Sequence, residues 1–128
     1  MIDIIAAVIV IIAFSIMVVF QFLLAIGLPI GHLAYGGQHK RLPTKFRILS
    51  IVAMGIFIYA ILIVLERTGI INLFNNPWVS LISIWILAIY FTIGVLMNAV
   101  SRSEWEKRIM TPLALIIAIC CYLVAIFA

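Results

Sequence analysis

The chain has 128 residues, of which 68% are hydrophobic and only 9% are charged. Average soluble domains are about half apolar and about a quarter charged, so this composition excludes a soluble globular domain and a disordered chain. Eight Lys and Arg against four Asp and Glu give a net charge of +4, which is scattered along the chain and indicates no binding to nucleic acid. The composition predicts a single transmembrane domain over residues 1–128.

Four apolar runs are long enough to cross a bilayer, and we expect a helix in each of them: residues 4–28, 48–65, 79–100 and 109–127. None of these runs alternates apolar and polar residues with a period of two, which argues against the strands of a barrel. Pro112 suits the first turn of the last helix. The predicted fold class is therefore all-α, a polytopic membrane protein with an antiparallel bundle of four transmembrane helices.

Positive charges in the connecting segments predict the orientation. Residues 29–47 hold four Lys or Arg and residues 101–108 hold three, whereas the segment between the second and third helices has only Arg67. Segments 29–47 and 101–108 are therefore expected in the cytoplasm, with both termini outside. No Lys or Arg precedes Lys40, so the first run is expected to be a retained helix and not a cleaved signal peptide.

Small and polar side chains that recur every three or four positions predict the face of each helix that packs inside the bundle. Asn98 lies beside such a stripe, and Cys120 and Cys121, adjacent on one helix, are expected to be packing residues and not a disulfide. The expected stripes, from the first helix to the fourth, are Phe14, Gln21, Ala25 and Leu28; Ser50, Ala53, Phe57, Ala60 and Val64; Ser80, Ser83, Leu87, Tyr90, Gly94, Met97 and Ser101; and Thr111, Ala114, Ala118, Cys121, Ala125 and Ala128.

A shift of 67 residues reveals a weak internal similarity. It pairs Ile26-Gly27 with Ile93-Gly94, Lys40-Arg41 with Lys107-Arg108, and Thr44 with Thr111. Such a pattern predicts two parallel repeats of a helical hairpin. Chance agreement between segments of the same topology is the alternative.

The segment from Gly31 to Arg47 contains most of the side chains in the sequence that are suited to binding a ligand. Its two adjacent glycines permit positive φ angles, and its cations can hold a phosphate or an anionic headgroup. We expect this cytoplasmic segment to bind a lipid headgroup, a small anion or a partner protein, through His32, Tyr35, Gly36, Gly37, His39, Lys40, Arg41, Lys45 and Arg47. The alternative is that these cations only set the orientation of the chain.

Two further functions stay open. Polar side chains within the helices could line a path through a small, dimeric channel or carrier: Gln21, Ser83, Tyr90 and Asn98. All four acids are expected at helix ends or in loops, which disfavours proton-coupled export of the kind performed by small multidrug transporters.

An enzyme that acts at the membrane surface through His32 and His39 is the third alternative. The spacing of these histidines relative to Glu104 and Glu106 matches no pattern of metal ligands. We expect no catalytic residues, metal or cofactor.

The run Gly31-His32-Leu33-Ala34-Tyr35-Gly36-Gly37-Gln38-His39, with Leu42-Pro43 and Arg47, resembles a loop of small bacterial four-helix inner-membrane proteins of unknown function. The stretch from Asn98 through Ser101-Arg102-Ser103 to Met110-Thr111-Pro112 is similar to the same proteins. The resemblance covers most of the chain and implies a bacterial inner membrane, but no activity and no site residues. The expected partners are membrane lipids, with a second copy of the chain or another membrane protein as further candidates.

Overall fold

The computed structural model describes all 128 residues and contains four long helices and no strand. The helices are α1 (Ile2–Ala25), α2 (Thr44–Arg67), α3 (Pro77–Ala99) and α4 (Glu104–Phe127), and the long connection after α1 contains two 3₁₀ turns, η1 (Gly31–Leu33) and η2 (Tyr35–Gly37). Each long helix is apolar enough to cross a membrane. The predicted all-α bundle of four membrane-spanning helices is confirmed.

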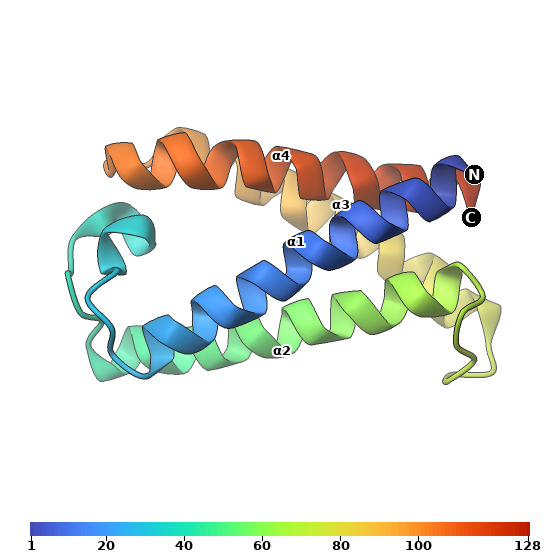
Figure 1. Ribbon diagram of the computed structural model, residues 1–128, viewed down its shortest axis with the longest axis horizontal. Helices are drawn as coiled ribbons and strands as arrows, with labels where there is room; N and C mark the ends of the chain where they lie inside the picture. The colour runs from blue at the N-terminus through green and yellow to red at the C-terminus, as the bar shows by residue number, and fades with distance from the viewer.

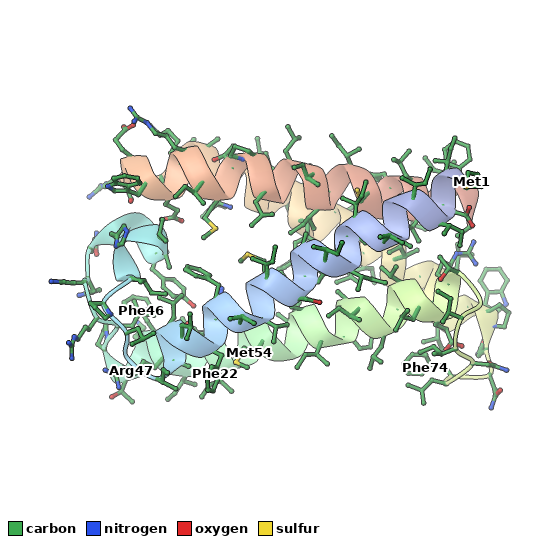
Figure 2. The ribbon with its side chains drawn as sticks, in the orientation of Figure 1. Met1, Phe22, Phe46, Arg47, Met54 and Phe74 are labelled. Atoms are coloured by element: carbon green, nitrogen blue, oxygen red, sulfur yellow. The ribbon has the colours of Figure 1, made fainter.

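Consecutive helices pair as antiparallel hairpins, α1 with α2 and α3 with α4 (Figure 1). The helix α1 also packs along α4, whereas α2 and α3 contact each other less extensively. Both termini lie at one end of the molecule with loop 2 (residues 68–76), and loop 1 (residues 26–43) lies at the other end with the 100–103 turn. Figure 2 accordingly shows Phe46 and Arg47 beside loop 1, at the opposite end from Met1 and Phe74.

The helices do not coincide with the apolar runs. The helix α2 begins at Thr44 and not at residue 48, and α4 begins at Glu104 and not at residue 109. Ser103 explains the second difference, because its side chain caps α4 by accepting a hydrogen bond from the backbone N–H of Glu106 at 3.2 Å. Pro112 therefore lies inside α4, and the prediction that it belongs to the first turn is wrong.

The first helix is shorter than expected. It ends at Ala25 and not at residue 28, because Gly27 has a φ of +91°, which is incompatible with a continued right-handed helix.

The core is densest in the half of the bundle that holds the termini. Small residues of α1 and α4, among them Ala6, Ala7 and Ala118, are buried there and allow the helices to approach closely. Near the middle of the bundle the ring of Phe14 lies 6.0 Å from that of Phe57 and 5.4 Å from that of Phe91, and the last two rings stack at 5.7 Å between centroids. These three aromatic rings close the dense half toward loop 1.

The predicted interior stripes hold for most of α2 and for part of α4; the remaining predicted residues, Ala53, Thr111, Ala114 and Ala128, are half-buried. The structure buries Ser50, Phe57, Ala60 and Val64 on α2, and Ala118, Cys121 and Ala125 on α4. Cys120 and Cys121 are both buried and form no disulfide, as expected for packing residues.

The predicted stripe of α3 is only partly correct. Ser80 and Leu87 are buried, but Tyr90 is 50% exposed and Met97 is 66% exposed. The packing face turns instead through Ile84, Ala88 and Phe91, since α3 packs chiefly on α4 and stands apart from α2. On α1, Phe14 is buried as predicted, whereas Leu28 lies beyond the end of the helix and is 40% exposed. The predicted stripe is thus partly wrong on α3, where this helix diverges from α2, and on α1, where the helix ends early.

The weak repeat does not correspond to equivalent positions. Gly27 follows the end of α1, whereas Gly94 lies inside α3. Thr44 is the first residue of α2, whereas Thr111 lies well inside α4. The two hairpins are present, but the 67-residue shift does not superpose their elements.

Candidate functional site

Loop 1 has a defined conformation that depends on its glycines. Tyr35, Gly36 and Gly37 have successive positive φ angles of 50°, 76° and 70°. The backbone N–H of Gly31 donates to the carbonyl of Lys40 at 2.8 Å and closes the loop. The buried side chains of Leu24, Ala34 and Leu42 form a small apolar cluster beneath it. Loop 1 is therefore folded back over the end of the bundle.

Hydrogen bonds attach loop 1 to the beginning of α4. The carboxylate oxygen Oε2 of Glu106 accepts from the backbone N–H of Gly36 and from the hydroxyl of Ser101, both at 2.9 Å. The hydroxyl of Ser103 donates to the carbonyl of His32. The two segments predicted to be cytoplasmic thus meet, and Glu106 and Ser103 hold them together.

A cavity of about 690 Å³ lies between loop 1 and the four helices. This volume is typical of sites that bind small molecules. Its wall is mostly apolar and includes Met17 and Phe20 of α1, Ala53 and Phe57 of α2, Phe91, Ile93, Gly94 and Met97 of α3, and Met110, Leu113, Ala114 and Ile117 of α4. Loop 1 contributes Leu33, Ala34, Tyr35, Gly36 and Gln38.

Two free amides lie on this apolar wall. The side-chain oxygen of Gln21 is buried and has no hydrogen-bond partner. Asn98 of α3 also lines the cavity. A buried amide without a partner costs roughly 1–3 kcal/mol, so Gln21 is suited to a polar ligand that enters the cavity.

Two charged side chains also reach the cavity, Glu106 and Arg102. Only 8% of Glu106 is exposed, whereas Arg102 is exposed and lies at the rim. The ion pairs of this turn are formed by the neighbouring Glu104, with Lys107 at 3.5 Å and Arg108 at 3.8 Å. Glu106 and Arg102 form no ion pair within the protein.

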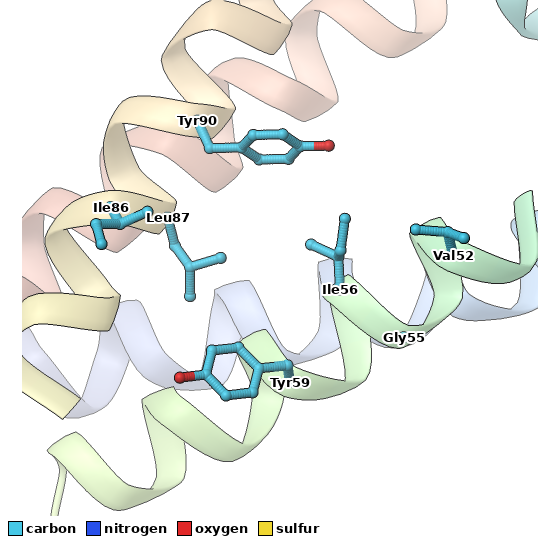
Figure 3. A pocket seen from close by; sticks show the side chains of 7 residues that line it. All are labelled: Val52, Gly55, Ile56, Tyr59, Ile86, Leu87 and Tyr90. Atoms are coloured by element: carbon cyan, nitrogen blue, oxygen red, sulfur yellow. The ribbon is translucent and has the colours of Figure 1, made fainter. Parts of the chain in front are cut away.

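A smaller pocket of about 400 Å³ lies between α2 and α3 (Figure 3). It is lined by Val52, Gly55, Ile56 and Tyr59 of α2 and by Ile86, Leu87 and Tyr90 of α3. Tyr90 lines both spaces, so the pocket and the cavity adjoin at its ring. Ile86 is 60% exposed on the outer surface of the bundle, which indicates that this side faces lipid.

The structure separates the residues that we expected to bind a ligand in loop 1. Tyr35 and Gly36 line the cavity, whereas Gly37 packs against Ser103. His32 contacts the edge of Trp105 at 6.2 Å between ring centroids, and His39 contacts Phe46 at 5.6 Å. No three His, Cys, Asp or Glu side chains gather where they could hold a metal ion.

The cations of this segment do not line the cavity. Lys40, Arg41 and Lys45 are exposed, and the ammonium of Lys45 lies 5.6 Å from the centre of the Phe46 ring. Arg47 instead serves the fold, since its guanidinium donates to the carbonyl of Leu42 at 2.7 Å.

Three of the four side chains proposed for a polar path reach the cavity. Gln21, Tyr90 and Asn98 line it. Ser83 does not, because its hydroxyl bonds to that of Tyr59 at 2.7 Å and joins α3 to α2.

Sequence reasoning missed Glu106 as a cavity residue. We assigned it to a loop, but it lies in the first turn of α4 and is buried. The spacing Ser103-x-x-Glu106 is that of a helix capping box, and this signal predicts that α4 begins at residue 104. A helix that begins at residue 104 contains the carboxylate of Glu106 in its first turn.

Comparison with models of protein families, with curated proteins and with solved structures gives no match to this chain. Its own helices establish a small integral membrane protein with four membrane-spanning segments. Any more specific function must be inferred from the cavity and loop 1.

Proposed function

We propose that this protein is a non-enzymatic membrane protein that binds one lipid, with the headgroup under loop 1 and the acyl chains between α2 and α3. The observation that supports this most strongly is the cavity of about 690 Å³, which combines apolar walls with a few polar groups at the loop 1 end. Sites for amphiphilic small molecules have this composition. The adjoining pocket at Tyr90 gives the acyl chains a route toward the lipid-facing surface.

The same proposal includes the orientation. Loop 1 and the 100–103 turn face the cytoplasm of a bacterial cell, and both termini lie on the other side of the inner membrane. The support is the excess of Lys and Arg at the loop 1 end. The exposed Lys40, Arg41 and Lys45 then contact anionic headgroups of the surrounding leaflet, at about 1 kcal/mol each.

A substitution that fills the cavity tests the proposal. A Cβ added at Gly94 meets no atom within 4 Å, so Gly94→Leu places a side chain in free space without a clash. We expect native mass spectrometry of the protein extracted with its own lipids to show one lipid bound to the wild type and little or none to Gly94→Leu. The control is Ala99→Leu, an exposed position on the same helix. Absence of lipid from the wild type, or equal retention by Gly94→Leu, contradicts the proposal.

The second candidate function is a channel or carrier, formed by one chain or by two. It is favoured by the position of Gln21 on α1 and of Tyr90 and Asn98 on α3, since all three line the cavity. Because Phe14, Phe57 and Phe91 close the cavity toward the other end, transport requires these rings to move. A carrier would show potassium or chloride efflux from proteoliposomes that falls in Gln21→Ala and Asn98→Ala. Efflux equal to that of protein-free liposomes, or efflux unchanged by both substitutions, excludes this path.

A further inference from the structure

The carboxylate of Glu106 is buried without a cation. Only 8% of the residue is exposed, and both of the hydrogen bonds that it accepts go to Oε2, from Gly36 and Ser101. Oε1 accepts none, while the side chain lines the cavity. A charge withdrawn from water is costly unless an opposite charge compensates it. The free oxygen is therefore a position for a cation that comes with the ligand.

Arg102 is a cation that lines the same cavity and does not pair with Glu106. It lines the cavity, is exposed at the rim and forms no ion pair with any acid of the chain. A guanidinium binds a phosphate through two parallel hydrogen bonds, which makes Arg102 suited to a phosphodiester. The cavity thus offers one site for a cation and one for a phosphate.

These two charges discriminate among headgroups. A purely anionic headgroup pairs with Arg102 but is repelled by the carboxylate of Glu106. A headgroup without any charged group leaves both side chains without a partner. A zwitterionic headgroup that carries an ammonium and a phosphate satisfies both. The amide N–H groups of Gln21 and Asn98, which also line the cavity, can donate to the ester oxygens of the same molecule.

On the basis of the proposed function, we infer that the lipid under loop 1 is a zwitterionic aminophospholipid of the phosphatidylethanolamine type, whose ammonium pairs with Glu106 and whose phosphate pairs with Arg102. The exposed lysines outside the cavity contact the anionic leaflet as a whole, whereas the cavity selects by the pairing of both charges. Selectivity for the bound lipid and attraction to the membrane surface therefore depend on different residues.

Native mass spectrometry with equimolar phosphatidylethanolamine and phosphatidylglycerol of identical acyl chains tests the inference. Charge-assisted hydrogen bonds are about twice as strong as neutral ones, so we expect the wild type to prefer phosphatidylethanolamine by about tenfold or more. Glu106→Gln retains an oxygen that can accept from Gly36 and should abolish the preference. Glu104→Gln is the matched control, because Glu104 lies in the same turn, exposed and outside the cavity lining, and should preserve the preference.

A second pair of variants covers the case in which Glu106→Gln fails to fold. Arg102→Gln removes an exposed side chain and should lower retention of phosphatidylethanolamine severalfold, whereas Arg108→Gln, exposed and absent from the cavity wall, should not. Equal or tighter binding of phosphatidylglycerol by the wild type overturns the inference while leaving lipid binding intact. Failure of the wild type to retain either lipid overturns the proposed function itself.

Discussion

Gly36 and Gly37 have nearly the same φ angle but different neighbours. Their φ angles are 76° and 70°, both in the left-handed region that side chains disfavour. A Cβ at Gly36 would meet no atom within 4 Å, whereas a Cβ at Gly37 would lie 2.6 Å from the Cβ of Ser103. Because Ser103 both caps α4 and bonds to the carbonyl of His32, Gly37 allows loop 1 to approach the helix that it is attached to.

This difference predicts unequal effects of the same substitution. Gly36→Ala should cost about 1 kcal/mol, the strain of a left-handed alanine. Gly37→Ala should cost clearly more, because it also forces loop 1 away from Ser103. Thermal unfolding of both variants in detergent measures the difference, with Gly36→Ala as the control for backbone strain. Equal melting temperatures would show that contact with Ser103 does not hold loop 1.

Among the elements, α4 contains two opposing features. The cap at Ser103 stabilises its beginning by about 1 kcal/mol. Pro112 weakens the helix just over two turns later, because proline has no N–H to donate to the carbonyl of Arg108. The first turns of α4, which carry Glu106, are thus held by their cap and by loop 1 more than by continuity with the rest of the helix.

Replacement of Pro112 should therefore stabilise the protein. Pro112→Ala restores one backbone hydrogen bond, and up to about 3 kcal/mol separates proline from alanine in a helix interior. We expect a higher melting temperature and slower amide hydrogen exchange over residues 104–112. Pro77→Ala is the control, because Pro77 occupies the first position of α3, where no N–H is required, and should change little. A lower melting temperature for Pro112→Ala would show that the proline is required for the path of α4.

The beginnings of α2 and α4 show what apolar runs can and cannot predict. The length of an apolar run measures the thickness of hydrocarbon that a helix crosses, whereas the helix itself continues as long as its backbone is hydrogen-bonded. Thr44 and Glu104 begin helices whose first turn is polar and lies outside the run. The number of helices could thus be predicted, but their ends depended on Ser103 and Gly27, which are signals of capping and of positive φ.

At the scale of the whole molecule, one half is densely packed and the other contains the cavity. The contribution of α4 to the dense half could be predicted from the spacing of its small residues, which is a local property of that helix, whereas the buried Ala6 and Ala7 of α1 lie outside the predicted stripe. The cavity could not be anticipated, because it depends on the divergence of α3 from α2 and on the path of loop 1. Both features depend on contacts between segments that are distant in the sequence, and no local sequence pattern predicts such contacts.

The position of all cationic clusters at one end leads to a prediction about orientation. Thr44→Cys and Asn72→Cys place exposed thiols at opposite ends of the molecule without changing its charge. In intact bacterial cells we expect a membrane-impermeant thiol reagent to label Asn72→Cys, and to label Thr44→Cys only after the cells are permeabilised. The wild type gives the background, which should be low because Cys120 and Cys121 are buried. The reverse labelling pattern would contradict the predicted orientation.

The hydrogen bond from Gly36 to Glu106 spans 70 residues, and this separation has a consequence for biosynthesis. Loop 1 leaves the ribosome long before α4 does. The residues to which it bonds, Ser103 and Glu106, are therefore not yet synthesised while α1, α2 and α3 enter the bilayer. Contacts between residues so far apart in sequence form late. The wall that loop 1 gives the cavity is therefore completed only after the last helix has been translated, and a lipid can be enclosed during insertion without loop 1 having to open afterwards.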